Sequence, residues 1–299
     1  MVNSLNLFKK SVHIYTALFL FYGSIAFGAS VPEAKDEIEL KFSKPKISGN
    51  LFCVPISQIQ QLFKNTVKTE ISHIDFSESD LREFIDQVNL NPDDIDSRIT
   101  LGLIYGNKEK YLKALEEFKF VLKKEPDHLL ALYSTGLIHL FDENHLEALK
   151  YFSKVVELDN TNAYAYFNKG MIEYARFEKE DALQSLKKAI ELDNYLIEAH
   201  YNLGVIYGSE AHGIALQGHV GGGYDEREYQ EYLKKAVKEF KAALRVKPDH
   251  FGALYNMGLS YLFLEKFDEA FIAADYLEEI NPFLGQQLRF RVENPVATH

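Results

Sequence analysis

The chain has few of the residues on which enzymes, disulfide frameworks and metal sites are usually built. Cys53 is its single cysteine among 299 residues, so no internal disulfide can form. The HExxH and GxSxG motifs of hydrolytic enzymes are absent, as are paired-cysteine motifs. The glycines at 221–223 are not followed by the Gly-Lys-Ser/Thr of a phosphate-binding loop. These absences predict a protein that is not an enzyme and has no nucleotide, cofactor or metal site.

The histidines do not point to a metal or catalytic site either. His212 and His219 lie on one glycine-rich segment, but no third ligand follows at a recognised spacing, so we interpret them as solvated loop residues. His128 and His250 each follow a Pro-Asp pair, and we interpret them as turn residues that face solvent. No catalytic role is assigned to any of them.

Positive charge is also scarce. Lys and Arg total 33 against 44 Asp and Glu, which gives a net charge of −11. Binding to phosphate arrays depends on clustered Lys and Arg, so nucleic acid and anionic lipid are disfavoured as partners. We expect a protein or peptide partner whose contacting segment is neutral or basic.

The N-terminus has the pattern of a secretory signal peptide. Lys9 and Lys10 precede an uncharged stretch, residues 11–30, with a strongly apolar centre. Ala26 and Gly28 have the small-residue spacing of a cleavage site. The pattern predicts export, with a periplasmic or secreted location.

An uncleaved membrane anchor is the alternative interpretation of the same residues. About 20 apolar residues suffice to span the hydrocarbon layer, and the uncharged stretch only just reaches this length. Either interpretation places the rest of the chain outside the cytosol, and the second keeps it close to a membrane.

A long-period repeat accounts for most of the chain. Five glycines lie 34, 34, 54 and 34 residues apart, and an alanine follows four of them twelve residues later and the fourth glycine 32 residues later, which is twelve plus a 20-residue insertion. The glycines are Gly102, Gly136, Gly170, Gly204 and Gly258, and the alanines are Ala114, Ala148, Ala182, Ala236 and Ala270. Between these landmarks apolar residues recur three or four apart, as in Leu115, Phe118 and Leu122, which predicts amphipathic helices. A period of this length predicts stacked helical hairpins in which no single unit buries its own apolar face.

The segments AHYNLGVIYGS, ALYNMGLSYLFLEKFDEAF and YAYFNKGMIEYARFEKEDALQSLKKAIELDN show the pattern in full. With its recurring small, aromatic and turn positions, the chain resembles the tetratricopeptide repeat (TPR) family over residues 95–284. The resemblance implies an all-α fold, a right-handed α-solenoid of stacked antiparallel helix hairpins known as the TPR superhelix. His139 and Glu173 replace the aromatic residue that Tyr105 supplies in the first unit, so we expect slightly different packing in those two units.

The repeat and the local composition set the boundaries between the segments of the chain. Residues 1–28 form the signal peptide or anchor, residues 29–55 a flexible tether, and residues 56–94 a helical N-terminal cap with a degenerate half repeat. Residues 95–284 contain five TPR units, and residues 285–299 form a C-terminal cap and tail.

Three local patterns refine this division. Ser77, with Asp80 three residues later, predicts the start of a helix over 78–90. A 20-residue insertion near 209–228 separates the two helices of the fourth unit and predicts a longer hairpin, whose second helix is capped by Asp225. Phe283 to Phe290 is expected to form a short helix that closes the last unit.

In the TPR family the first helix of each unit lines a concave groove that binds extended peptides or partner helices. Carried over to this chain, the groove has two rows of side chains. Two residues before each glycine lie the polar residues Thr100, Ser134, Asn168, Asn202 and Asn256, and three before lie the aromatic residues Tyr133, Phe167, Tyr201 and Tyr255. An asparagine amide both donates and accepts hydrogen bonds, so such a row can hold a peptide backbone. The alternative is that these residues satisfy neighbouring helices and fill the core.

One specialisation of the family is disfavoured. The clamp that holds an acidic C-terminal tail requires Lys and Arg at groove positions, where this chain has Ile99, Tyr164 and Asn168.

The leading hypothesis is a non-catalytic protein interaction scaffold outside the cytosol, active in envelope or complex assembly. A membrane-tethered assembly factor is the alternative, and an enzyme that uses the inserted hairpin is less favoured than either.

Overall fold

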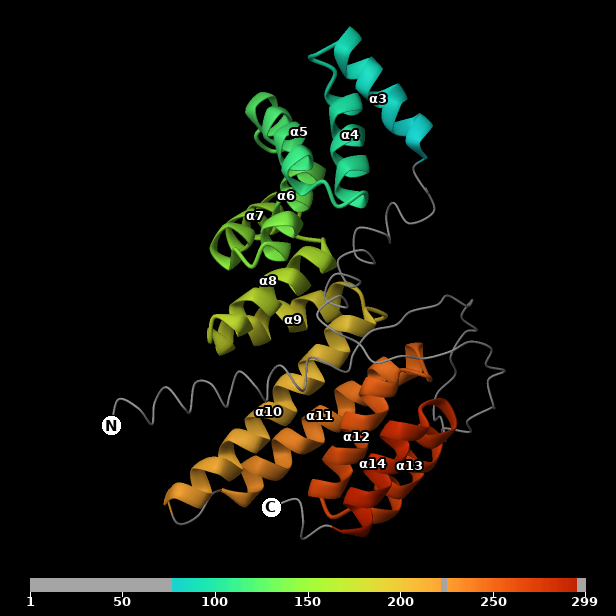
Figure 1. Ribbon diagram of the computed structural model, residues 1–299. Coiled ribbons are helices and arrows are strands. Elements are labelled where there is room, and N and C mark those ends of the chain that lie inside the picture. The colour runs from blue at the N-terminus through green and yellow to red at the C-terminus, as the bar shows by residue number, and fades with distance from the viewer. Residues whose placement is uncertain (1–76, 222–224, 295–299) are drawn as a thin grey trace. The chain divides into compact units, whose positions relative to one another are not determined.

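The computed structural model describes residues 77–221 and 225–294 (Figure 1). Every regular element within these two ranges is an α-helix. The predicted signal peptide, the tether and the first part of the N-terminal cap, all within residues 1–76, lie outside the described residues. So do the hairpin tip at 222–224 and the tail at 295–299.

The helices form two compact units, one ending at Asn194 and the other beginning at Tyr195. The first contains α3 (Glu78–Leu90), α4 (Ile95–Asn107), α5 (Tyr111–Lys124), α6 (Leu129–Phe141), α7 (His145–Leu158), α8 (Ala163–Ala175) and α9 (Lys179–Leu192). The second contains α10 (Ile197–Gly221), α11 (Glu226–Val246), α12 (Phe251–Phe263), α13 (Phe267–Ile280) and α14 (Pro282–Glu293). Within each unit, consecutive helices pair as hairpins that stack on one another (Figure 1). The predicted all-α fold of stacked helix hairpins is confirmed.

Side chains at one repeat position begin the first helix of three successive hairpins. Asp94, His128 and Asn162 each accept a hydrogen bond from the backbone N–H three residues further on, at 3.4, 3.3 and 2.9 Å. These bonds satisfy a donor that the first turn of a helix otherwise leaves without a partner. Ser77 begins α3 with a full capping box, in which Asp80 accepts from the Ser77 backbone N–H at 2.6 Å, as the sequence predicts.

Each repeat glycine allows a large apolar side chain to pack against its helix. A Cβ atom added at Gly102 would lie 2.6 Å from the ring of Phe118, and one at Gly204 would lie 2.7 Å from Phe240. Both phenylalanines are essentially without solvent exposure. The glycine and the large residue on the second helix, sixteen positions later or 36 in the fourth hairpin with its insertion, therefore interlock the two helices of a hairpin, which explains why both recur with the repeat.

The turn between the two helices of a hairpin has one backbone conformation in four units. Glu109, Glu143, Phe177 and Glu265 have φ values of 59°, 57°, 65° and 57°, and each lies seven residues after the repeat glycine. This left-handed region is unfavourable for residues with a side chain, because Cβ approaches the following carbonyl oxygen. The tight turn holds these residues in a strained conformation.

The fourth hairpin replaces this turn with two long helices. α10 continues for 25 residues and α11 for 21, so the insertion extends both helices of the hairpin. Asp225 caps α11, because its Oδ1 accepts from the backbone N–H groups of Arg227 and Glu228 at 2.9 and 3.3 Å. The predicted longer hairpin and its cap are confirmed.

α14 closes the second unit against α12 and α13 (Figure 1). Its buried residues are Leu284, Gly285, Leu288 and Val292. Leu288 packs directly on Gly258, the glycine of the fifth hairpin. The residue sixteen positions after this glycine is Ala274, which is too small for the role that Phe240 has in the fourth hairpin. α14 therefore supplies the large side chain that the fifth hairpin lacks.

Candidate functional site

The polar row predicted from the sequence lies on the first helix of each hairpin. Thr100, Ser134 and Asn168 are on α4, α6 and α8 of the first unit, and Asn202 and Asn256 are on α10 and α12 of the second. Thr100 is partly exposed, whereas the other four side chains are buried.

Two asparagines of the polar row make the same hydrogen bond to the preceding hairpin. Asn168 Nδ2 donates to the Tyr133 hydroxyl at 3.1 Å, and Asn256 Nδ2 donates to the Tyr201 hydroxyl at 3.3 Å. In each case the aromatic row of one hairpin is tied to the polar row of the next. The asparagine thereby fixes the position of a tyrosine, and its carbonyl oxygen and second N–H are not used in that bond.

Two further residues of the polar row bond within their own helix. Asn202 Nδ2 donates to the Glu198 backbone carbonyl at 2.8 Å, and Thr100 Oγ1 donates to that of Asp96 at 2.9 Å. These bonds to the carbonyl four residues earlier orient the side chains along the helix. Asn202 therefore differs from the two asparagines that bridge hairpins.

The aromatic row is buried to different depths in the two units. Tyr201 and Tyr255 are 4% and 8% exposed, and Phe167 is 6% exposed, whereas Tyr133 is partly exposed. Burial raises the pKa of Tyr201 well above its ordinary value, and the hydrogen bond from Asn256 opposes that rise only in part. Tyr201 is therefore a neutral core residue. Tyr133 is the aromatic of this row that a ligand can contact.

Other first-helix side chains of the first unit are also accessible. Leu103 on α4, Tyr164 on α8 and Met171 on α8 are partly exposed, as Tyr133 on α6 is. We call these four residues the first-helix face of residues 77–194. Three successive first helices thus present apolar or aromatic side chains that are neither fully buried nor fully solvated.

His250 has a role that the sequence did not reveal. Its Nδ1 accepts a hydrogen bond from the Ala253 backbone N–H at 3.0 Å, which caps α12, and its ring centroid lies 4.8 Å from that of Tyr201. Burial and the nearby Lys247 lower the pKa of His250 to about 4. The expectation that this residue faces solvent is wrong, because only 7% of it is exposed. A signal was available, since His250 precedes its glycine by the same eight residues as the capping side chains Asp94, His128 and Asn162.

The third hairpin replaces the expected aromatic with a polar triad. Glu173 is 5% exposed and forms an ion pair with Lys169. Lys169 Nζ donates to Ser185 Oγ at 3.1 Å, and Ser185 Oγ donates to Glu173 Oε2 at 2.7 Å. The triad satisfies the buried carboxylate, so Glu173 holds α8 to α9 by hydrogen bonds where Tyr105 in the first hairpin packs as a buried ring.

His200 and Glu239 form a second buried polar contact, between α10 and α11. His200 Nδ1 lies 2.7 Å from Glu239 Oε2, and both side chains are largely buried. No group of three His, Cys, Asp or Glu side chains with the geometry of a metal site occurs in residues 77–221 and 225–294. The pair joins the two helices of the long hairpin.

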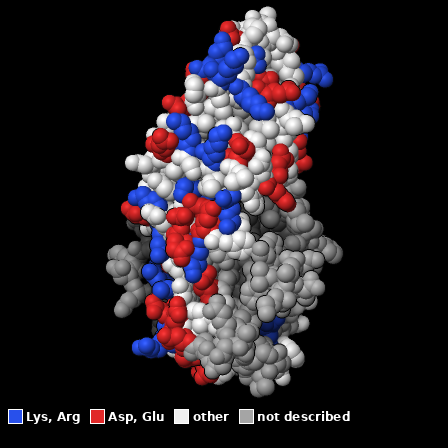
Figure 2. Space-filling model, turned by 90° about the vertical axis from the view of Figure 1, so that its left-hand side faces the viewer, with Lys and Arg blue, Asp and Glu red and all other residues white. Residues whose placement is uncertain are grey.

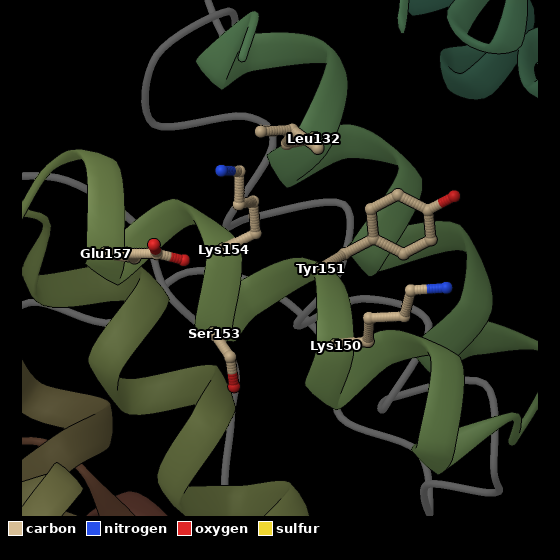
Figure 3. Close-up of a pocket in the computed structure, with 6 residues that line it drawn as sticks. All are labelled: Leu132, Lys150, Tyr151, Ser153, Lys154 and Glu157. Carbon is tan, nitrogen blue, oxygen red and sulfur yellow. The ribbon is translucent and has the colours of Figure 1, made fainter. Parts of the chain in front are cut away.

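A surface hollow between α6 and α7 lacks the features of a ligand site (Figure 3). It is lined by Leu132 of α6 and by Lys150, Tyr151, Ser153, Lys154 and Glu157 of α7. The polar ends of Lys150 and Lys154 point in different directions, and Lys154 Nζ pairs with Asp127 at 3.1 Å. Small-molecule sites instead bring a few polar groups together on one point.

Charged residues of both signs are mixed on one face of the described residues. On the face shown in Figure 2, Lys and Arg are interspersed with Asp and Glu, and the described residues form no large patch of one sign. Within the described ranges, no helix combines the length and the apolar character needed to cross a membrane.

Three solved structures have folds similar to this one. YrrB, a TPR protein with an unusual peptide-binding site, is 22% identical with a TM-score of 0.52, and the match covers 69% of this chain and 97% of YrrB. PilW, a widely conserved type IV pilus biogenesis factor, is 18% identical with a TM-score of 0.53, covering 76% of this chain and 99% of PilW. PilF of Pseudomonas aeruginosa is 19% identical with a TM-score of 0.52, covering 67% and 85%.

Family models match the repeat directly. The tetratricopeptide repeat model matches residues 99–163 and 225–284, and a TPR repeat model matches residues 170–209. No curated protein gives a significant match to the chain. The matched residues make up more than half of the sequence and coincide with the hairpins of the structure. The chain belongs to the tetratricopeptide repeat family.

Proposed function

We propose that the protein is a non-catalytic scaffold that binds an extended or helical segment of a partner protein along the first helices of its hairpins. The observation that carries the proposal is the first-helix face of residues 77–194. Leu103, Tyr133, Tyr164 and Met171 are partly exposed on three successive first helices. Apolar and aromatic side chains of this kind provide the contact area of protein interfaces.

The polar and aromatic rows have distinct roles in this proposal. Tyr133 contacts the partner, and Asn168 holds the Tyr133 ring in place through its 3.1 Å hydrogen bond. The partly exposed Thr100 and the buried Ser134 occupy the equivalent repeat position on α4 and α6. The second unit has its own set of these positions in the proposal, Asn202, Asn256 and Tyr255, and the buried Tyr201 supports Asn256. Phe167 supports the face from within the core.

The partner segment is neutral or basic in this proposal. The chain carries a net charge of −11, so an acidic segment would be repelled at long range. The groove positions that would hold cations in an acidic-tail clamp are occupied by Ile99, Tyr164 and Asn168. YrrB offers a precedent for peptide binding by a TPR protein of similar fold.

The proposed setting is outside the cytosol, in the assembly of an envelope or multiprotein complex. Its support is the sequence of residues 1–30, where two lysines precede an uncharged apolar stretch. An uncleaved anchor at the same residues is the alternative, with the scaffold tethered to a membrane. N-terminal sequencing of the mature protein separates the two, because cleavage after Gly28 removes the anchor.

Site-specific photocrosslinking tests the binding face. A photoreactive amino acid at Leu103 or Met171 should form crosslinks to a specific partner in native cell fractions. The matched control places it at Lys119, an exposed position on the second helix α5. If the control crosslinks the same proteins equally well, the first-helix face is not the binding surface.

A second experiment tests the asparagines of the polar row. Changing Asn168, Asn202 and Asn256 together to Ala should weaken partner binding, because two tyrosines lose the bonds that position them. Circular dichroism must first show that the variant keeps its helix content. Unchanged binding by a folded variant would limit these asparagines to a role in packing.

A further inference from the structure

The outer face of α14 is unusual for the end of a helical stack. Its inner face is apolar and buried through Leu284, Leu288 and Val292. On the opposite side, Phe283 is 63% exposed and Phe290 is 61% exposed. End helices of repeat arrays normally present a polar outer face, because no further repeat covers them.

The two phenylalanines lie on one side of the helix. They are seven residues apart, which is close to two full turns, so their side chains project in nearly the same direction. Gln286 and Gln287 lie between them and are exposed. The face therefore has an aromatic residue at each end and uncharged polar residues in the middle, a pattern that looks the same from either end.

We propose that α14 is a homodimer interface, in which it packs antiparallel against α14 of a second copy of this chain. With the two-fold axis between Gln286 and Gln287, Phe283 of one copy meets Phe290 of the other, and the reverse contact forms at the other end. A two-fold interface requires such self-complementarity, because the same surface must serve both partners. This inference is independent of the proposed partner-binding face.

Two exposed charges near the ends of the helix, one of them on α13, fit the same arrangement. Arg291 is exposed near the C-terminal end of α14, and Glu279 is exposed three residues before its N-terminal end. Antiparallel packing brings Arg291 of one copy towards Glu279 of the second copy, twice in the dimer. Arg289 serves another purpose, because it already bonds to Asp275 and Glu278 on α13. Parallel packing would bring like charges together at both ends.

The size of the face sets the expected strength of the dimer. Stable interfaces bury about 800 Å² per partner, and one face of a twelve-residue helix offers less than this. The four phenylalanines compensate in part, since an aromatic side chain buries roughly 150–250 Å². We expect a dissociation constant on the order of 10 μM, so the dimer forms and dissociates with concentration.

Cysteine crosslinking tests the geometry. In the whole chain with Cys53→Ser, Gln287→Cys lies beside the proposed axis and should form a disulfide-linked dimer on mild oxidation. Asn294→Cys, at the C-terminal cap of α14, is the first control, because antiparallel packing separates its two copies by about 22 Å along the axis. Gln184→Cys, exposed on α9, is the control for random collision. At least tenfold more crosslinking at Gln287 than at either control supports the proposal, and equal crosslinking at Asn294 overturns it.

Sedimentation equilibrium of the whole chain tests whether the side chains named above hold the dimer together. Phe283→Ser with Phe290→Ser should raise the dimer dissociation constant at least tenfold, whereas Phe177→Ser, which changes an exposed phenylalanine in the other unit, should leave it unchanged. Arg291→Glu should weaken the dimer, and adding Glu279→Arg should restore it. Because these side chains are exposed, folding should be preserved, which circular dichroism checks. An unmodified chain that stays monomeric at 100 μM, or a dimer that none of the changes weakens, would overturn the proposal.

Discussion

The two units of the protein solve the same packing problem in different ways. In residues 77–194, each repeat glycine meets a large residue of its own hairpin, as Gly102 meets Phe118. In residues 195–294, Gly204 meets Phe240 in the same way, but Gly258 meets Leu288 from α14. The comparison shows that the repeat specifies a space to be filled rather than a particular residue. A helix outside the repeat can fill it.

The largest expected effect comes from emptying that space in either unit. Phe152→Ala in the first unit should reduce the free energy of unfolding by about 3–5 kcal/mol, and Leu288→Ala in the second by about 2–5 kcal/mol. Both side chains have no measurable exposure, so each change leaves a cavity. Amide hydrogen exchange, read separately for the helices of each unit, should show the loss confined to the unit that was changed.

A compensating change sharpens this comparison. If Leu288 replaces the missing large residue of the fifth hairpin, Ala274→Phe should partly restore the stability of the Leu288→Ala variant. The same Ala274→Phe change in the unmodified chain should destabilise it, because Leu288 already occupies the space. Additive losses in the double variant would show that the two positions do not share one cavity.

Acid should destabilise the second unit through His250. The pKa of His250 is about 4 in the folded protein against an ordinary value of 6.5, so between these values the unfolded chain binds a proton that the folded protein does not. The free energy of unfolding is therefore unaffected by protonation of His250 above pH 6.5. It falls as the pH drops from 6.5 to 4, by about 3 kcal/mol in total. Lys247 lies nearby and disfavours the charged imidazole further.

The change His250→Asn isolates this effect. Asparagine also caps helices, as Asn162 does for α8, but it does not titrate. The variant should keep most of its stability at pH 7 and should lose the part of the pH dependence between 6.5 and 4 that belongs to His250. Exchange of the α12 amides measured from pH 7 to pH 4 checks this. An equally steep pH dependence in the variant would assign it to other groups.

A third comparison uses one hydrogen bond that occurs in both units. Tyr201→Phe should cost about 1–3 kcal/mol, because it leaves the buried Asn256 amide without its partner. Tyr133→Phe should cost less than about 1 kcal/mol, since Tyr133 is partly exposed and water can replace the lost bond to Asn168. Urea unfolding of the two variants measures the difference, and equal losses would show that burial does not distinguish the two bonds.

The hairpins could be predicted from the sequence because their determinants are local. A glycine, an alanine twelve residues later and a large residue after that all lie within one unit, so their spacing can be read directly. The caps at Ser77 and Asp225 could be predicted for the same reason. The contact of Leu288 with Gly258 could not, because α14 does not follow the register of the repeat.

The candidate site was harder to predict, because a residue type does not reveal its burial. The sequence identified the polar and aromatic rows, but only the structure separates the partly exposed Tyr133 from the buried Tyr201. His250 was misread because its Pro-Asp neighbours suggested a solvated turn. Comparison with Asp94 and Asn162 at the equivalent repeat position would have predicted a helix cap, though not its contact with Tyr201.

A final comparison concerns the strained turns that four of the hairpins share. Phe177 has a φ of 65° and is 69% exposed, so replacing it with glycine relieves backbone strain and loses little packing. Phe177→Gly should therefore raise the stability of the first unit by about 1 kcal/mol. The matched control is Glu180→Gly, three residues later in α9, which should lower stability by about 1 kcal/mol because glycine is unfavourable inside a helix. Opposite signs for these two glycines, measured by urea unfolding, would identify turn strain as the cause. A loss of stability at both positions would mean that Phe177 makes contacts worth more than the strain it carries.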